Sequence, residues 1–262
     1  MLMNELLGSL LTGLLGGFVS GLLGVTSGGI LVPLLILLLG REQHAAQGLS
    51  LLAQVFPASL SGVRNYARHG HDVSWRWVGY LGAGFAVGGV LGALAAGGVP
   101  DRALRWSFVA YLVLLMVLMV VSRRRRAHND NSPAAAIGTP AHWSALIAIG
   151  AVGGLSSGFL GIGGGLAIAA LMTAVLHLPQ HRAQAFSLAV TALPLTLPAA
   201  WIYIRQGWNI SWIIVAGIVA GLWAGTLIGA QFANRIPEAN LRRLSFLFIG
   251  AMALYMAFRA LM

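Results

Sequence analysis

The chain has 262 residues, of which 58% are hydrophobic and only 8% are charged, and its mean hydropathy is +0.83. A soluble domain has about a quarter of its residues charged, so this composition excludes that class and indicates an integral membrane protein. The apolar runs are long, rich in glycine and free of strict alternation, which favours an all-α polytopic helix bundle over a β-barrel.

The formal net charge of +10 rests on arginine alone, because the chain contains no lysine. The arginines lie between or beside apolar runs instead of forming one basic face, so the positive-inside rule explains them and no nucleic-acid partner is expected. The chain also lacks cysteine, which excludes disulfides and iron–sulfur clusters, and no cofactor is expected. Residues 1–24 have neither a basic region nor an Ala-x-Ala site, so we expect a retained membrane segment.

In chain order, the apolar runs of the first half cover residues 4–25, 29–40, 44–67, 76–97 and 101–122. Those of the second half cover residues 142–162, 165–178, 181–204, 211–234 and 240–261. Most are long enough to cross the bilayer, which takes about 20 helical residues. The second run of each half is short and follows a glycine-rich break, and the sequence leaves open whether it spans the membrane or forms a re-entrant hairpin.

These runs predict a first membrane repeat over residues 1–122, a polar cytoplasmic linker over 123–141 and a second membrane repeat over 142–262. A shift of 137 positions superimposes the two halves without a gap. The matched residues include Gly17, Gly21, Gly24, Gly28 and Tyr66 with Gly154, Gly158, Gly161, Gly165 and Tyr203. An odd number of crossings per half inverts the second repeat, and only that arrangement keeps most loop arginines on the side of the tetra-arginine linker. We therefore expect two inverted repeats of about five helical segments each.

The glycine-rich breaks stand at matching places in the two repeats, a pattern that points to the binding site of a transporter. An interrupted helix leaves backbone N–H groups and a positive dipole end that can receive an anion. The candidate substrate-binding residues of the breaks are Thr26, Ser27, Gly28, Gly29, Gly163, Gly164 and Gly165. With inverted repeats we expect the two helix N-termini to converge on one anion. The alternative is that these glycines only allow helices to cross closely.

A second group of polar residues follows each short run at spacings of three, which puts each group on roughly one helix face. Its candidate substrate-binding residues are Gln47 and Ser50 in the first half and Arg182, Gln184 and Ser187 in the second. His44 and His181 are candidate proton-coupling residues, because histidine titrates near neutral pH. The alternative for each histidine is an interfacial residue at a helix start.

Other residues receive weaker or purely structural interpretations. Gln54, Thr191 and Thr196 are weaker site candidates, and the prolines at 57, 194 and 198 are expected to kink their helices. Two glycine series are expected to be packing seams: Gly84, Gly88 and Gly92, and Gly221, Gly225 and Gly229. Six tryptophans are expected in interfacial belts: Trp75, Trp77, Trp106, Trp143, Trp208 and Trp212.

Every acid falls in a loop or at a segment end, so we expect no buried carboxylate for a cation or a proton relay, no catalytic residue and no metal site.

The glycine pattern resembles that of the TauE/SafE sulfite-exporter family. It runs Gly17, Gly21, Gly24, Gly28, Gly29 and Pro33, and recurs at Gly154, Gly158, Gly161, Gly163, Gly164 and Gly165. The resemblance covers essentially the whole chain apart from the linker. The chain departs from the pattern at Thr26 and Ser27, which replace two glycines, and at Ala170, where the proline would repeat. The resemblance implies movement of sulfite, thiosulfate, sulfonates or related anions across a bacterial cytoplasmic membrane.

The sequence thus predicts a multi-pass secondary transporter, not an enzyme, that works by alternating access of its two repeats. The expected partners are a small sulfur-containing anion, the lipid bilayer and coupling protons, and the expected direction is export. A permease for another small solute, either a carboxylate or a metal cation, is the alternative, and a membrane enzyme or an assembly scaffold is a third hypothesis. The sequence does not determine the anion, the coupling ion or the oligomeric state.

Overall fold

The structure, a computed structural model, describes residues 2–23, 27–56, 73–128, 142–176, 178, 180–208, 210–233 and 238–261. Every regular element in these ranges is a helix. The first repeat contributes α1 (Leu2–Leu23), α2 (Gly28–Leu39), α3 (Gln43–Val55), α5 (Trp75–Gly97) and α6 (Asp101–His128). The second contributes α7 (Trp143–Leu160), α8 (Gly165–Val175), α9 (Gln180–Thr191), α10 (Leu197–Arg205), α11 (Trp212–Ala233) and α12 (Glu238–Leu261). The predicted all-helical membrane class is confirmed.

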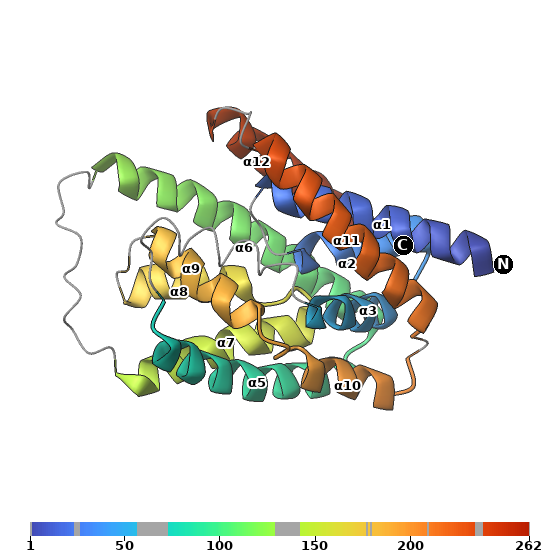
Figure 1. The fold of residues 1–262 in the computed structure, drawn as a ribbon, viewed down its shortest axis with the longest axis horizontal. Coiled ribbons are helices and arrows are strands. Elements are labelled where there is room, and N and C mark those ends of the chain that lie inside the picture. Colours follow the sequence, from blue (N-terminus) through green and yellow to red (C-terminus); the bar gives the residue numbers. More distant parts are fainter. Residues whose placement is uncertain are drawn as a thin grey trace.

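The helices of the two repeats correspond at the predicted offset. Adding 137 to the first residue of α2, α3, α5 and α6 gives the first residue of α8, α9, α11 and α12. Figure 1 shows α1 and its counterpart α7 running in opposite directions along the long axis of the molecule, and α6 and α12 do the same. The second repeat is therefore inverted relative to the first.

The two repeats are interlocked through their long helices. In the described ranges, the helices long and apolar enough to cross a membrane are found within α1, α5, α7 and α11. They form two pairs, each with one member from each repeat: α1 packs along α11, and α5 packs along α7. Each repeat thus completes its own helix pair with a helix of the other.

Both predicted glycine seams are confirmed as sites of close backbone approach. A Cβ atom at Gly84, Gly88 or Gly92 of α5 would collide with the carbonyl oxygens of Ile147, Ala151 and Leu155 of α7, respectively. A Cβ atom at Gly221, Gly225 or Gly229 of α11 would collide with the carbonyl oxygens of Leu10, Leu14 and Phe18 of α1. The numbers rise together along both partners, so each pair is parallel. Small residues allow this spacing without a side chain between the helices.

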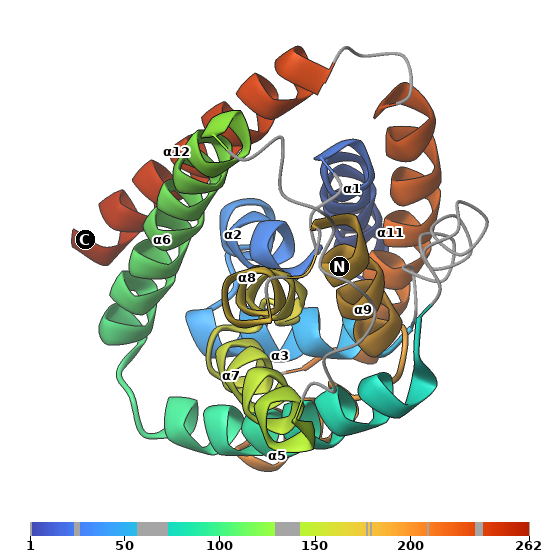
Figure 2. The same ribbon diagram turned by 90° about the vertical axis from the view of Figure 1, so that its left-hand side faces the viewer.

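A third contact between the repeats joins α6 to α12 at the periphery of the molecule (Figure 2). Arg102 and Arg105, in the first turns of α6, donate hydrogen bonds to the backbone oxygens of Ala260 and Arg259 at the end of α12. Cationic side chains are favourable at a helix C-terminus, where the last carbonyls lack intrahelical partners.

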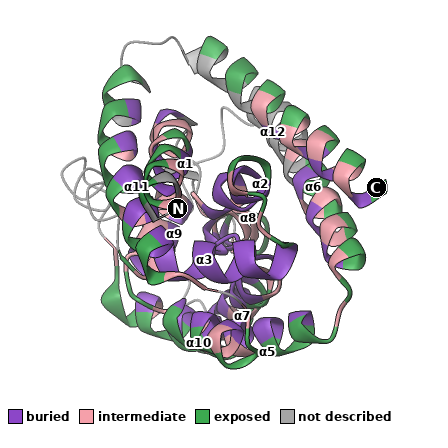
Figure 3. Cartoon of the chain, turned by 90° about the vertical axis from the view of Figure 1, so that its right-hand side faces the viewer, coloured by how far each residue is buried: buried purple, intermediate pink, exposed green. Residues whose placement is uncertain are grey.

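The short helices lie inside this frame. In Figure 2, α2, α3 and α8 occupy the middle, with α5, α6, α11 and α12 around them. Figure 3 shows α3 almost entirely buried, and its residues from Gln43 to Ala53 are all buried. At about 1.5 Å per residue, a helix of 12 residues such as α2 is shorter than the hydrocarbon core, which is about 30 Å thick. Neither α2 nor α8 crosses the membrane as one helix.

In two predicted segments a helix ends near a proline, and α6 continues to His128 instead of ending at residue 122 as predicted. Segment 181–204 is not one kinked helix but two, because α9 ends at Thr191 and α10 begins at Leu197. Pro194 lies in the turn between them, where its missing N–H and its ring prevent a continuous helix, whereas Pro198 lies in the first turn of α10, where no intrahelical N–H is needed. In segment 44–67, α3 ends at Val55, because Phe56 precedes a proline and is extended (φ −88°, ψ 112°). The rest of that segment lies outside the described residues.

Candidate functional site

The two glycine breaks meet at the centre of the molecule. The second break separates α7 from α8, and its residues Gly161, Gly163 and Gly164 have φ values of 73°, 80° and 61°. Such left-handed backbone is strained for residues with a side chain. Gly28, the first residue of α2, lies against this break: a Cβ atom on Gly28 would lie 2.6 Å from the carbonyl carbon of Ile162 and 2.7 Å from its oxygen.

Gln54, which we expected only as a weaker site candidate, lies between the two breaks. Its Nε2 atom would be 2.6 Å from a Cβ atom on Gly28, and its Oε1 atom is the nearest neighbour of a Cβ atom on Gly163. Nε2 also donates hydrogen bonds to the carbonyl oxygens of Ser50 (3.0 Å) and Gly161 (3.2 Å). Gln54 therefore links the end of α3 to both breaks.

Ser50 and Ser187, both predicted to bind substrate, hold the backbone of the second break. Ser50 Oγ donates to the carbonyl oxygen of Gly161 at 2.8 Å, and Ser187 Oγ donates to that of Gly165 at 2.6 Å. These carbonyls lie at the end of α7 and the start of α8. Each hydroxyl proton is engaged by a carbonyl in this conformation, so the serines support the break.

Gln47 and Tyr203 form a buried contact between the repeats beside the same break. Tyr203 OH lies 2.9 Å from both Gln47 Oε1 and the carbonyl oxygen of Gly158, so its one hydrogen is shared between these two acceptors. The Cα atom of Gln47 would be 2.8 Å from a Cβ atom on Gly161. Sequence reasoning used Tyr203 only as a marker of the repeat. The signal that could have identified it is its tyrosine counterpart at position 66, together with the place of Tyr203 itself in the largely apolar run 197–204.

The remaining predicted residues fall into three groups. Ser27 and Gly29 flank Gly28 at the first break, and Gly164 is the N-cap of α8. Arg182 and Gln184 are half-buried on α9, whereas the nearest neighbours of Gly28, Gly161 and Gly163 come from α3 and the second break. Thr26, Gly24 and the side chain of His181 lie outside the described residues.

His44 lies at the other end of α3 from Gln54 and belongs to a separate cluster. Its ring contacts the Asp101 carboxylate and stacks on Trp208, with ring centroids 4.0 Å apart. Asp101 stands at the start of its segment, as expected, and is 32% exposed, and its carboxylate contacts the buried His44. Trp208, expected in an interfacial belt, is half-buried against His44.

The arrangement can bind an anion through backbone groups. The first N–H groups of a helix have no intrahelical acceptor, and α2 and α8 both begin at this centre. A Cβ atom on Gly29, next to the contact between the breaks, would meet nothing within 4 Å. There is thus open space beside Gly29 at the N-terminus of α2, and no acidic side chain is found among the described residues that touch the breaks.

An inverted pair of repeats, interlocked across the membrane with broken helices meeting at the centre, defines a membrane transporter. The chain belongs to the sulfite exporter TauE/SafE family, whose family model matches residues 9–256. The chain is accordingly a multi-pass membrane transporter and not an enzyme. No match is found among the curated proteins or the solved structures.

Proposed function

We propose that this protein is a secondary transporter that exports a small sulfur-containing anion, such as sulfite, thiosulfate or an organosulfonate, across a bacterial cytoplasmic membrane. The family supports the class of substrate. The observation that carries the proposal is the contact between Gly28 and Ile162, because it brings the two helix breaks together at one place.

In this proposal the anion lies at the N-termini of α2 and α8, next to Gly29. Backbone N–H groups and the positive ends of the two helix dipoles neutralise its charge. Ser27 supplies a hydroxyl at the start of α2, and Gln54, whose Nε2 donates to the carbonyl oxygens of Ser50 and Gly161, holds α3 against the second break. Ser50 and Ser187 keep the second break open by binding its carbonyls.

Alternating access follows from the interlocked architecture. The anion site lies where the repeats touch, and each long pair combines one helix from each repeat. Sliding of α1 against α11 and of α5 against α7 changes the contact between Gly28 and Ile162 and so exposes the site to one side at a time. The smooth glycine seams allow such movement because no side chain interlocks across them.

The test is anion flux through the purified chain in proteoliposomes. We expect saturable movement of sulfite, thiosulfate or a sulfonate, and no comparable movement of acetate or of a divalent metal cation. Flux of a carboxylate or of a metal in place of the sulfur anions would establish the alternative permease and contradict the proposal.

Gly29→Leu tests the site itself. Its side chain would enter the open space at the start of α2, so we expect loss of anion flux with an unchanged unfolding temperature. Gly79→Leu is the matched control, because a Cβ atom on Gly79 of α5 also meets nothing within 4 Å but lies on the exposed surface. Normal flux through Gly29→Leu would exclude the N-terminus of α2 as the site.

A further inference from the structure

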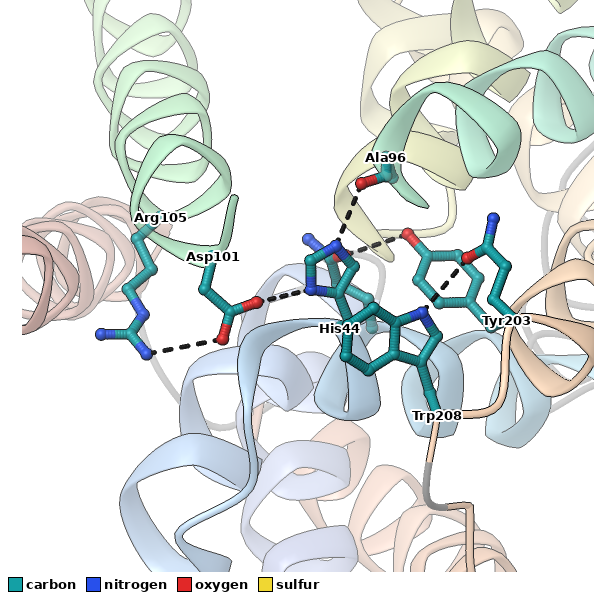
Figure 4. A network of polar contacts seen from close by, with 8 residues as sticks. His44, Ala96, Asp101, Arg105, Tyr203 and Trp208 are labelled. Carbon is teal, nitrogen blue, oxygen red and sulfur yellow. Dashed lines mark hydrogen bonds and ion pairs between the residues drawn. The ribbon is translucent and has the colours of Figure 1, made fainter. Parts of the chain in front are cut away.

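A second polar cluster lies apart from the glycine breaks, where α3, α5, α6 and the segment between α10 and α11 come together (Figure 4). His44 is at its centre, and its side chain is only 3% exposed. Nδ1 lies 2.5 Å from Oδ1 of Asp101, and Nε2 lies 3.0 Å from the carbonyl oxygen of Ala96. Both ring nitrogens therefore face an oxygen.

The number of protons follows from these two contacts. A backbone carbonyl can only accept, so Nε2 must carry a hydrogen. The neutral tautomer with hydrogen on Nε2 leaves a lone pair on Nδ1 facing a carboxylate oxygen, which is repulsive. The other neutral tautomer leaves a lone pair on Nε2 facing Ala96. Both contacts are satisfied only when the pair holds one proton more than a neutral imidazole beside an ionised carboxylate.

We infer that His44 and Asp101 form a proton-binding site that is occupied in this conformation and that fastens the first repeat to the second through Trp208. The inference deepens the proposed function by naming the coupling ion and its site, and its transport consequence rests on that function. The glycine breaks do not take part in this site.

Trp208 couples the proton on the His44–Asp101 pair to the contact between the repeats. Its indole stacks on the His44 ring at an interplanar angle of 4°, and an aromatic face attracts a cationic imidazolium. The indole is held in place, because its Nε1 donates to Gln206 Oε1, and Gln206 Nε2 donates to the carbonyl oxygen of Ala93 in α5. Removal of the proton takes away the charge that the indole faces and sets the lone pairs of Nδ1 and the carboxylate against each other.

The charged groups around the pair are few among the described residues. Arg105 Nη2 lies 3.8 Å from Oδ2 of Asp101, so a positive charge stands beside the carboxylate. Glu42, just before α3, lines the same pocket. Packed against the ring, α5 contributes only the Ala96 carbonyl, and the segment between α10 and α11 contributes Trp208, which does not titrate.

Water can bring protons to the pair. An open pocket of about 480 Å³ is lined by Glu42, His44, Asp101 and Trp208, together with residues 97–100. Asp101 is 32% exposed while His44 is almost fully buried. The carboxylate is therefore the route by which a proton passes between the pocket and the ring.

The repeat carries the same residue types a second time. Adding 137 to His44, Asp101 and Arg105 gives His181, Glu238 and Arg242. The side chains of these three residues lie outside the described part of the chain.

The first experiment measures the unfolding temperature of the purified full chain from about pH 5 to about pH 8. Asp101→Asn and His44→Gln each remove the pair, and Glu42→Gln is the matched control, since it removes one negative charge from the same pocket. The folded pair holds an extra proton, so its stabilisation is present at low pH and is lost as the pH rises. We expect wild type to exceed Asp101→Asn by at least about 2–4 °C at the low end and this difference to shrink toward the high end.

His44→Gln should behave as Asp101→Asn does, and Glu42→Gln should follow wild type at a constant offset. His44→Gln also serves as the second route should Asp101→Asn not fold. The inference is overturned if Asp101→Asn or His44→Gln keeps the wild-type pH dependence of the unfolding temperature. It is also overturned if Glu42→Gln loses that pH dependence as fully as the two pair variants do.

The second experiment measures internal pH during thiosulfate flux in proteoliposomes, because thiosulfate itself does not titrate in this range. Proton movement coupled to the anion in wild type and in Glu42→Gln, but lost in Asp101→Asn, supports the site. An unchanged ratio of protons to anions in Asp101→Asn overturns it. Absence of thiosulfate flux in wild type would argue against the proposed substrate alone, and the pH profile of unfolding would still decide the proton site.

Discussion

Gly28 of the first repeat touches Ile162 of the second so closely that a Cβ atom on Gly28 would lie 2.6 Å from the carbonyl carbon of Ile162. The two helix breaks thus form one continuous centre, although each is built from a different half of the chain. Any movement of one repeat against the other must change this contact. The contact also makes the glycine at position 28 indispensable for packing, whatever binds beside it.

We expect Gly28→Ala to lower the unfolding temperature. Alanine normally stabilises a helix relative to glycine by about 0.5–1 kcal/mol. At this position the added methyl group would overlap Gln54 Nε2 and the Ile162 backbone, and overpacking costs about 1–3 kcal/mol. The clash is expected to dominate, because the backbone of Ile162 cannot rotate away as a side chain would. Gly29→Ala is the control, since its methyl group meets nothing within 4 Å, and equal stability of the two variants would contradict the prediction.

Gly88 and Gly89, adjacent residues of α5, provide a second matched pair of variants, which tests the seam between α5 and α7. Gly88→Ala places a methyl group against the carbonyl oxygen of Ala151, so the two helices must separate and the unfolding temperature should fall. Gly89→Ala places it 3.7 Å from Ala199 Cβ and from the carbonyl oxygen of Gly154, an ordinary van der Waals contact. Thermal unfolding of both variants measures the seam, and a loss in Gly89→Ala as large as in Gly88→Ala would show that it tolerates no substitution on either side.

Tyr203→Phe removes a buried hydroxyl that lies 2.9 Å from Gln47 Oε1 and from the carbonyl oxygen of Gly158. Leaving buried acceptors without a donor costs about 1–3 kcal/mol. We expect a lower unfolding temperature and reduced anion flux, because the hydroxyl joins α10 to α3 and α7 beside the second break. Tyr80→Phe, on the exposed face of α5, should leave both unchanged. A stable and fully active Tyr203→Phe would mean that the hydroxyl does not position the break.

Ser50→Ala tests whether the second break depends on its side-chain support. The variant loses the donor to Gly161 O, and this oxygen keeps only the longer 3.2 Å hydrogen bond from Gln54 Nε2. We expect a loss of about 1–3 kcal/mol in stability and weaker anion binding in a thermal-shift titration. Ser107→Ala removes an exposed hydrogen bond of the same kind, from Ser107 Oγ to Ala103 O, and should have little effect. A wild-type titration curve for Ser50→Ala would separate the serine from substrate binding.

Much of the fold was predictable because the relevant signals are local or repeated. Apolar run length identified the membrane helices, and the offset of 137 residues predicted which helices of the two repeats correspond. The glycine series at spacings of four predicted the seams, since one helix face of glycines has few other uses in an apolar bundle. Proline effects were only partly predictable: the break at Pro194 ends a helix, where a kink was expected.

The candidate site was less predictable because its parts come from distant places in the chain. Gln54 looked weak beside the regular trio of His44, Gln47 and Ser50, yet it lies against both breaks. The trio itself is divided: Gln47 and Ser50 contact the second break, whereas His44 pairs with Asp101. Residues on one helix face point the same way from the helix axis. They can still have different neighbours, because they lie at different positions along the length of the helix.

The sequence by itself determined that this chain is a membrane protein of two inverted repeats with a glycine-rich break in each, because hydropathy, charge bias and internal repetition are properties of the chain. Only the tertiary structure decided that α1 pairs with α11 and α5 with α7, that Gly28 meets Ile162, and that a buried histidine contacts Asp101. These relationships depend on which surfaces meet after folding, and apolar helices of similar composition do not specify their neighbours through local pattern alone.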